Sequence, residues 1–327
     1  MHIPLVDNPT TFTCDQNTSL SGTYTSISWS EADCNTTAQA WLTDFAKNDT
    51  PSTQEAIDGL AHINAIRNSM GLPSFHYDSL LESASLKHED YIGDVYAQYN
   101  VWIAHYENNI DYPSAFYGGI NVYNRANAMG YTGTFVGEVI SFNSLNTVTT
   151  SLDELMSAIY HRNILIWSDS NEIGLGGTNR NFAFASQPHL VGRKNYKADF
   201  LRAITAREII NPFDGQTNVT RQFAEEIPDP LPNTSLSGYP VSLYFNDYYI
   251  NNVAVTSFKL YVDATNVEVT NVLLMDKLND PNNELTDHQF VLFPLDVLSG
   301  STVYRVEASW VEDGVNNSKI WRFTTRP

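Results

Sequence analysis

The sequence predicts an α+β protein whose larger part mixes helices with strands and whose last third is all β. Apolar residues recur at helical spacing in several segments before residue 170. Between those segments lie short runs rich in aromatic and β-branched residues, which are typical of strands. Beyond residue 210 the chain shows short alternating runs separated by turn residues.

Length and charge limit the organisation and the partners. The 327 residues are too many for one ordinary core and suit two domains. We predict a polar extension over residues 1–50, an α+β domain over residues 51–208 and a small β-sandwich domain over residues 209–327. The net charge of −19 argues against nucleic acid or an anionic membrane as partner, because both need a basic surface. No stretch approaches the roughly 20 apolar residues of a membrane helix, so we expect no membrane insertion.

Both cysteines, Cys14 and Cys34, lie in the extension. Two cysteines this close favour a loop-closing disulfide over a metal site, and two unpaired thiols are the simpler alternative. A disulfide would place the protein in an exported, oxidising compartment. Residues 1–4 lack the apolar segment of a signal peptide, so we expect a secreted or cell-surface protein whose export signal has been removed.

Helix signals begin at residue 52. Ser52 and Glu55 have the spacing of a capping box, and the apolar residues that follow keep helical spacing until Gly71-Leu72-Pro73 ends the helix. Asp78 is placed to cap a second helix. A short helix is predicted over Tyr123–Met129, closed by Gly130.

The next segment contains a predicted strand, a helix and a strand pair. Phe135–Phe142 has the content of a strand. A capping box of Ser151 and Glu154 predicts a helix that carries His161 and Arg162 at its C-terminal end, where the helix dipole favours cations. Glu172–Gly177 and Phe182–Val191 are predicted to pair as antiparallel strands, which indicates a mixed or antiparallel sheet.

The last third follows turn-rich segments at residues 211–215 and 228–232. The residues Glu312-Asp313-Gly314 predict a hairpin between the last two strands. No catalytic cluster is visible in this part. The predicted strands are Val241–Phe245, Val255–Val262, Val267–Leu274, Phe290–Leu295, Val303–Trp310 and Ile320–Thr325.

Six ordered motifs over residues 52 to about 190 resemble the bacterial branch of the CAP superfamily, the SCP-like extracellular domain of cysteine-rich secretory proteins. The motifs are Ala61–Arg67 with Met70–Pro73, His88, Ala104-His105, Arg125-Ala126 with Gly130-Tyr131, Gly137-Glu138, and His161–Leu165 with Glu172–Gly176. The resemblance implies an α-β-α sandwich with a central cleft. The last third resembles the immunoglobulin-like β domain that follows some bacterial members, through residues 228–230, 238–240 and 321–325.

The resemblance also places His105, Glu138 and His161 in one cleft. Two imidazoles and a carboxylate suit zinc or another divalent metal with an open fourth position. Glu172 is a candidate fourth ligand or an acceptor that orients an imidazole, and Arg162 is expected to pair with a carboxylate or cap carbonyls. The alternative is a hydrogen-bonded His/Glu network with a purely structural role.

Two departures from the family and several further histidines affect this interpretation. Val139 replaces the family's Asn after Glu138, and Ala158 stands where eukaryotic members carry a second acidic residue. We interpret His88 as a hydrogen-bonded core histidine. The other histidines, His62, His76, His189 and His288, are interpreted as structural or surface residues.

The sequence favours a non-enzymatic binding module over an enzyme. It contains no Gly-x-Ser-x-Gly elbow, no His-Glu-x-x-His pair and no phosphate-binding glycine loop. Some relatives bind lipids or sterols, and the aromatic-rich segment Tyr91–Tyr123 could line an apolar groove for such a ligand, although such tyrosines more often pack on a surface helix. We therefore expect a cleft for a divalent metal or a small apolar ligand. The alternatives are a metal-dependent hydrolase with Glu172 as general base, and a cell-surface interaction protein with a vestigial cleft.

Overall fold

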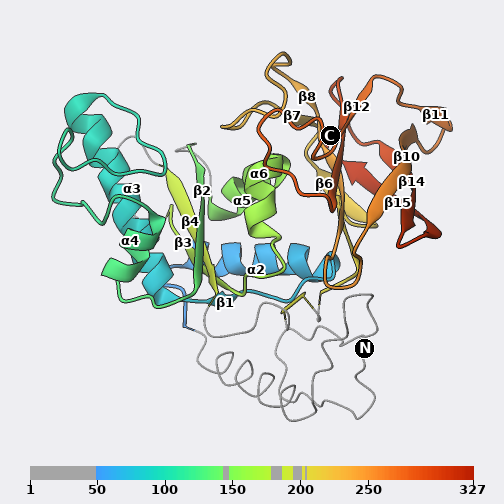
Figure 1. Ribbon diagram of the computed structural model, residues 1–327. Coiled ribbons are helices and arrows are strands. Elements are labelled where there is room, and N and C mark those ends of the chain that lie inside the picture. The colour runs from blue at the N-terminus through green and yellow to red at the C-terminus, as the bar shows by residue number, and fades with distance from the viewer. Residues whose placement is uncertain (1–48, 143–146, 178–185, 194–200, 203–204) are drawn as a thin grey trace, which may run out of the picture.

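The computed structural model describes residues 49–142, 147–177, 186–193, 201–202 and 205–327. Residues 1–48 of the predicted extension, with the predicted Cys14–Cys34 disulfide, lie outside these residues. Figure 1 shows two parts side by side, which we name the α+β region (residues 49–202) and the β region (residues 205–327). The β region begins with strand β5 (Glu208–Asn211).

A four-stranded sheet in the order β1-β3-β4-β2 forms the centre of the α+β region. The predicted antiparallel strand pair is confirmed, with Glu172 opposite Gly192 and Leu175 opposite His189. Its second strand is described from Gln187, whereas the predicted start at Phe182 lies outside the described residues. The strands are β1 (His76–Tyr77), β2 (Phe135–Ser141), β3 (Glu172–Leu175) and β4 (Gln187–Arg193).

Helices cover both faces of this sheet, so the predicted α-β-α sandwich is confirmed (Figure 1). Alternate residues of β2 pack against the helices on opposite faces of the sheet, because successive side chains of a strand point to opposite faces. Val136 packs with Leu81 and Ala126 on one side, whereas Val139 packs into the large apolar cluster on the other. One face carries α3 (Ser79–Tyr99) and α4 (Val122–Ala128), and the other carries α2 (Gln54–Ser69), α5 (Val148–Ser157) and α6 (Ile159–Leu165).

The ends of the first helices follow local sequence signals closely. Asp78 caps α3 as predicted, with its carboxylate accepting from the N–H groups of Leu80 (2.9 Å) and Leu81 (3.0 Å). Helix α2 ends where Gly71 adopts φ +79°, a conformation that glycine reaches without strain. The cap of α2 is Thr53 rather than the predicted Ser52, whose hydroxyl instead donates to Glu82 at 2.7 Å.

The predicted helix start at Ser151 is wrong, and so is the placement of His161 at a helix C-terminus. Helix α5 begins at Val148 and is capped by Thr147. Ala158 then has extended backbone (φ −91°, ψ 117°) and divides the predicted helix into α5 and α6. His161 is therefore the third residue of α6, near its N-terminus. The helix-dipole argument for a cationic His161 no longer applies, because the N-terminal end carries partial positive charge.

The β region is a sandwich of two sheets, in the orders β11-β10-β14-β15-β6 and β12-β13-β9-β5. The predicted hairpin is confirmed, with Asp313 (φ +47°) and Gly314 (φ +86°) forming its turn between paired Glu312 and Val315. The segment predicted as one strand over 267–274 is instead two short strands in different sheets. The strands are β6 (Gln216–Val219), β7 (Gln222–Phe223), β8 (Ser237–Gly238), β9 (Val241–Phe245), β10 (Val253–Val262), β11 (Val267–Glu268), β12 (Val272–Met275), β13 (Gln289–Pro294), β14 (Val303–Glu312) and β15 (Val315–Thr325).

The two regions share one apolar core. In β9, Leu243 and Phe245 pack inside the sandwich, whereas Tyr244 between them belongs to the cluster that contains Leu155 and Ile159 of α5 and α6. The four-stranded sheet of the sandwich is therefore buried on both faces.

No helix among the described residues combines the length and apolar character needed to span a membrane.

Candidate ligand-binding site

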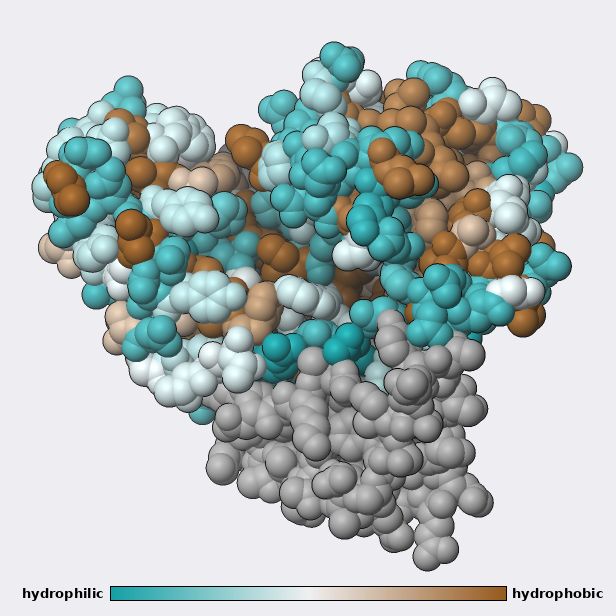
Figure 2. Space-filling model, in the orientation of Figure 1, coloured by the Kyte–Doolittle hydropathy of each residue, from teal (hydrophilic) through white to brown (hydrophobic). Residues whose placement is uncertain are grey.

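A cavity of about 640 Å³ lies between the α+β region and the β region. Its lining includes three of the predicted site residues, His105, Glu138 and His161. The β region contributes the opposite wall, including His288 and Gln289. Figure 2 shows the molecular surface hollowed between the two parts. The volume falls within the roughly 300–1,000 Å³ of ordinary small-molecule sites.

Glu138 of β2 is held as an ionised carboxylate. The guanidinium of Arg125, from α4, donates to both of its oxygens at 2.7 Å, and Nδ1 of His105 lies 2.9 Å from Oε2. Burial alone would raise the pKa of Glu138, but the charge of His88, the hydrogen bond from His105 and the charge of Arg125 lower it to about 2. Because Glu138 is ionised, Nδ1 of His105 must carry the proton of this hydrogen bond.

Behind Glu138 lies a second buried pair, His88 and Glu107. Nδ1 of His88 lies 2.8 Å from Glu107 Oε1, and Nε2 lies 2.8 Å from the carbonyl oxygen of Ala104. The other oxygen of Glu107 accepts from the backbone N–H groups of Gly118 (2.6 Å) and Gly119 (3.1 Å). Both nitrogens of His88 thus lie within hydrogen-bond distance of oxygen atoms. His88 is a fully buried, hydrogen-bonded histidine, as the sequence predicts.

His161 is held by a carboxylate from the other region. Oε2 of Glu226 lies 2.7 Å from Nδ1 of His161. The same carboxylate accepts from the backbone N–H groups of His161 (3.2 Å) and Tyr160 (3.1 Å), which are unpaired at the start of α6. Glu226 is buried, with 1% of its side chain exposed. It lies in the segment that joins β7 to β8.

Arg162 does not line the cavity. It is fully buried and points from α6 toward the β region, where it donates to the hydroxyl of Ser242 and lies 5.1 Å from the ring centroid of Tyr239. Its Nε also donates to the carbonyl oxygen of Met156 at 2.6 Å. Arg162 therefore links the two regions beneath the cavity and caps a carbonyl, as one of the sequence alternatives proposed.

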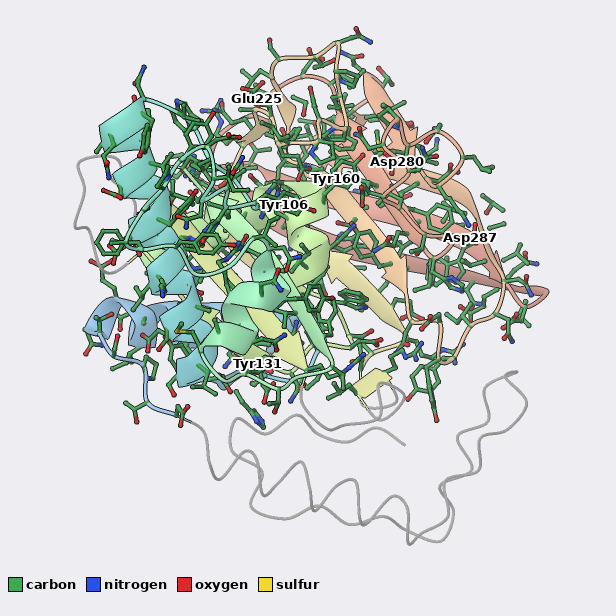
Figure 3. All side chains as sticks on the ribbon, turned by 60° about the vertical axis from the view of Figure 1, so that its left-hand side comes forward. Tyr106, Tyr131, Tyr160, Glu225, Asp280 and Asp287 are labelled. Atoms are coloured by element: carbon green, nitrogen blue, oxygen red, sulfur yellow. The ribbon has the colours of Figure 1, made fainter. Side chains whose placement is uncertain are left out.

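Glu172 is also remote from the cavity lining. Its carboxylate accepts a hydrogen bond from Tyr131 at 2.6 Å, and burial together with the charge of Glu172 raises the pKa of that tyrosine. In Figure 3, Tyr131 lies at the opposite end of the α+β region from Tyr160, the neighbour of His161. The structure thus brings His105, Glu138 and His161 to one cavity, but not Glu172 or Arg162.

The two residues that depart from the family pattern, Val139 and Ala158, lie in different surroundings. Val139 is fully buried in the apolar cluster and faces away from Glu138, so its side chain is not part of the cavity lining. Ala158 forms the break between α5 and α6. Ala158 offers no carboxylate, and the carboxylate that contacts His161 is Glu226, at 2.7 Å from Nδ1.

The remaining walls combine apolar and polar side chains. Ile164 and Trp167, from the end of α6 and the following loop, line one side, and the exposed Ile227 lies at the β region. The aromatic-rich segment Tyr91–Tyr123 contributes only His105 to the lining. Tyr91 of that segment is buried and accepts from the N–H of Asn108 at 2.9 Å.

Sequence reasoning missed the roles of two groups at the site, Arg125 and Glu226. Arg125 enters the sequence analysis only as part of a motif. His288, interpreted as a structural or surface residue, lines the cavity and has Nε2 at 2.9 Å from the carbonyl oxygen of Ile250. Glu226 lies 65 residues from His161 along the chain, and no local pattern connects them. An acidic pair, Glu225-Glu226, just before the turn-rich segment at 228–232 was the one available signal.

Within the described residues, no three His, Cys, Asp or Glu side chains form a group that could hold a metal ion. Both oxygens of Glu138 accept from Arg125, so this carboxylate fits the role of a group that orients His105 better than that of a ligand. The predicted three-ligand set of His105, His161 and Glu138 therefore does not fit the donor arrangement. Two imidazole Nε2 atoms remain as candidate donors at the cavity.

The α+β region has the sandwich architecture of a known protein family. Residues 60–180 match the family model described as the cysteine-rich secretory protein family, CAP. The chain therefore carries a CAP domain, as its motifs predicted. No curated protein matches the chain.

Similar solved structures include three bacterial proteins. An outer surface protein of Borrelia burgdorferi has 15% identity and a TM-score of 0.35, over 45% of this chain and 97% of that chain. An extracellular protein containing an SCP domain from Bacillus anthracis has 15% identity and a TM-score of 0.34, over 45% of each chain. A cysteine-rich secretory protein from Staphylococcus aureus has 16% identity and a TM-score of 0.32, over 45% of this chain and 42% of that chain. The chain thus spans less than half the length of the last two.

Proposed function

We propose that this protein is an exported, non-enzymatic binding protein whose cavity between the two regions holds a small ligand. The family match to cysteine-rich secretory proteins supports export. The observation that carries the binding role is the cavity itself, with His105 and His161 each oriented by a buried carboxylate. Side chains fixed in this way are prepared for contact with a ligand, since little conformational freedom is lost on binding.

A small organic molecule with an apolar part suits this cavity. The volume of about 640 Å³ is larger than a metal ion needs, and the lining includes Ile164, Trp167 and Ile227. A lipid or sterol would be one such molecule, and a cell-surface component that presents a small group would be another.

A divalent metal such as zinc is the second candidate ligand. It would be held by Nε2 of His105 and Nε2 of His161, with Glu138 and Glu226 orienting the rings from behind, as carboxylates often do for metal-bound histidines. A metal bound this way would supply Lewis acidity, and the hydrolase alternative depends on it.

The test compares the wild-type protein with a His105→Ala/His161→Ala double variant of verified fold. Protein recovered from culture medium is extracted, and the retained small molecules are identified by mass spectrometry. A molecule retained by the wild type and lost from the double variant is the expected result. His62→Ala serves as the control, because His62 contacts Asp153 at 2.7 Å and lies outside the cavity lining.

A zinc titration of metal-stripped protein by calorimetry separates the two ligands. Binding that disappears in the double variant would support the metal, and a screen for hydrolysis would follow. Failure of both the extraction and the titration would contradict the proposed function.

A further inference from the structure

Two histidines of the cavity present hydrogen-bond acceptors to a ligand. His105 and His161 each use Nδ1 toward a carboxylate, Glu138 at 2.9 Å and Glu226 at 2.7 Å. When Nδ1 of a neutral imidazole carries the proton, Nε2 is an acceptor. Both rings therefore offer a lone pair, and neither offers a donor, as long as they are neutral.

Asn163 of α6 holds a third acceptor, which is shielded from solvent in this structure. Its side-chain oxygen is buried, and no donor reaches it within the part of the chain that the structure describes. Asn163 lines the cavity, as do His161 and Ile164 of the same helix. A buried acceptor without a donor costs about 1–3 kcal/mol, so a ligand whose binding turns the Asn163 side chain and brings a donor to this oxygen recovers up to this amount.

The charged side chains around the cavity also disfavour an anionic ligand. Glu138, Asp169, Asp247 and Glu284 line it, whereas Arg202 is the single lysine or arginine among the described lining residues. Arg202 is already engaged, at 3.3 Å from carboxylate oxygens of both Asp169 and Asp247. An anionic ligand would thus meet carboxylates and lone pairs with no unengaged cation to receive it.

The apolar wall fits the rest of such a ligand. Trp167 is 42% exposed and packs edge to face on Phe135, with ring centroids 4.4 Å apart. Its ring and the side chain of Ile164 can contact an alkyl or aromatic body. A tryptophan face also attracts a cation by about 0.5–2 kcal/mol.

We propose that the cavity selects a ligand with an apolar body and a head group that donates hydrogen bonds, an amine or ammonium above all, and excludes carboxylates. This proposal rests on the proposed function and specifies the ligand class of the same cavity. Glu226 is a positioning residue: its contact with Nδ1 of His161 leaves Nε2 of that ring as the acceptor for the ligand, although Glu226 belongs to the β region.

The test uses three probes with the same tail: octylamine, octanol and octanoate. Each is titrated into the full chain at pH 8 by calorimetry. We expect octylamine to bind at least about tenfold more tightly than octanoate, with octanol between them. Octanoate binding as tight as octylamine binding would overturn the head-group preference alone. No binding by any probe would count against the cavity as a small-molecule site and therefore against the proposed function as well.

Substitution of Asn163 tests the same preference within the protein. Asn163→Leu removes the acceptor and is expected to reduce the ratio of octylamine to octanoate affinity by about tenfold. Asn163→Asp keeps an acceptor, adds charge and is expected to increase the ratio. Asn316→Leu, at an exposed position on β15, is the matched control and should leave the ratio unchanged. Equal ratios in all four proteins would contradict the role of Asn163.

NMR spectroscopy can distinguish a positioning role of Glu226 from a merely structural one. The ¹⁵N chemical shifts of the His161 ring report which nitrogen carries the proton. Glu226→Ala is expected to move the ring toward the Nε2–H tautomer and to weaken octylamine binding several-fold. Glu225→Ala, at the exposed neighbouring residue, should change neither.

Glu226→Gln keeps the shape and one acceptor oxygen, and it replaces the alanine variant if that variant loses its fold. An unchanged His161 tautomer in a folded Glu226→Ala protein would overturn the positioning role.

Discussion

His105 and His161 lie on the same cavity, but different parts of the chain hold them in place. His105 is fixed within the CAP domain by Glu138 and Arg125, which the family motifs already contain. His161 is fixed by Glu226, which comes from the β region. One half of the site is therefore internal to the domain, and the other exists only when the two regions are packed together. A family motif can be complete in one half of a site while the other half depends on a neighbouring domain.

The largest effect is expected at the His105 half. Glu138→Leu removes the carboxylate that lies 2.7 Å from the buried Arg125 and leaves Glu107, at 3.9 Å, as the remaining carboxylate among the described residues. Loss of one partner of a buried pair costs about 3–5 kcal/mol. The free energy of unfolding is measured with urea. Glu225→Leu, at an exposed carboxylate, should change it by less than about 0.5 kcal/mol. A loss under about 1 kcal/mol for Glu138→Leu would show that Arg125 finds another partner.

A smaller loss is expected at the His161 half. Arg162→Met keeps the aliphatic stem but removes the hydrogen bonds to Met156 and Ser242, at a cost of about 1.5–3 kcal/mol. The ring signals of His161 should shift in an NMR spectrum, whereas those of His105 should not. Arg207→Met, at an exposed ion pair with Glu312, is the control and should have little effect. Equal shifts at both histidines would contradict the division of the site into two halves.

The pH dependence of the free energy of unfolding tests a buried histidine of the core, His189, which belongs to neither half of the site. Burial lowers the pKa of His189 to about 3, so the folded protein keeps this ring neutral where the unfolded chain protonates it. The unfolded state then binds more protons between pH 6.5 and 3, and stability falls as pH decreases through this window. From pH 7 to pH 5 the loss is about 2 kcal/mol.

Glu138 does not interfere with this measurement. Its pKa is lowered to about 2, so its contribution is present above about pH 4.5 and is lost only as pH falls from there toward 2. Urea midpoints of the wild type and His189→Gln at pH 7 and pH 5 provide the test. The variant should lose less stability than the wild type, and equal losses would assign the pH dependence to another group.

The smallest effect on stability is expected at the cavity entrance. Ile227 is 89% exposed, so Ile227→Ser should change the free energy of unfolding by less than about 0.5 kcal/mol. Because Ile227 lines the cavity, octylamine affinity should still decrease. Unchanged octylamine affinity would show that Ile227 does not contact the bound ligand.

Sequence reasoning succeeded where structure depends on neighbouring residues. The cap at Asp78, the glycine that ends α2 and the turn at Asp313-Gly314 are set by local backbone chemistry. The His105–Glu138 contact followed from family motifs. The break at Ala158 was missed, because the extended backbone there interrupts a segment of continuous helical periodicity. Glu226 was missed because tertiary packing alone brings it to His161.

The apolar cluster shared by α5, α6 and the sheet of β9 and β13 limits how this protein can be divided. A fragment that stops before Glu208 would lack the members of this cluster that belong to the β region, among them Tyr244 and Phe293, and would expose apolar surface to water. Such a fragment is prone to self-association, since large exposed apolar patches drive aggregation. Cleavage of the backbone between the regions would leave them associated, because their apolar contact does not depend on the connecting peptide. The protein is one folding unit for purposes of truncation, even though its family domain covers only residues 60–180.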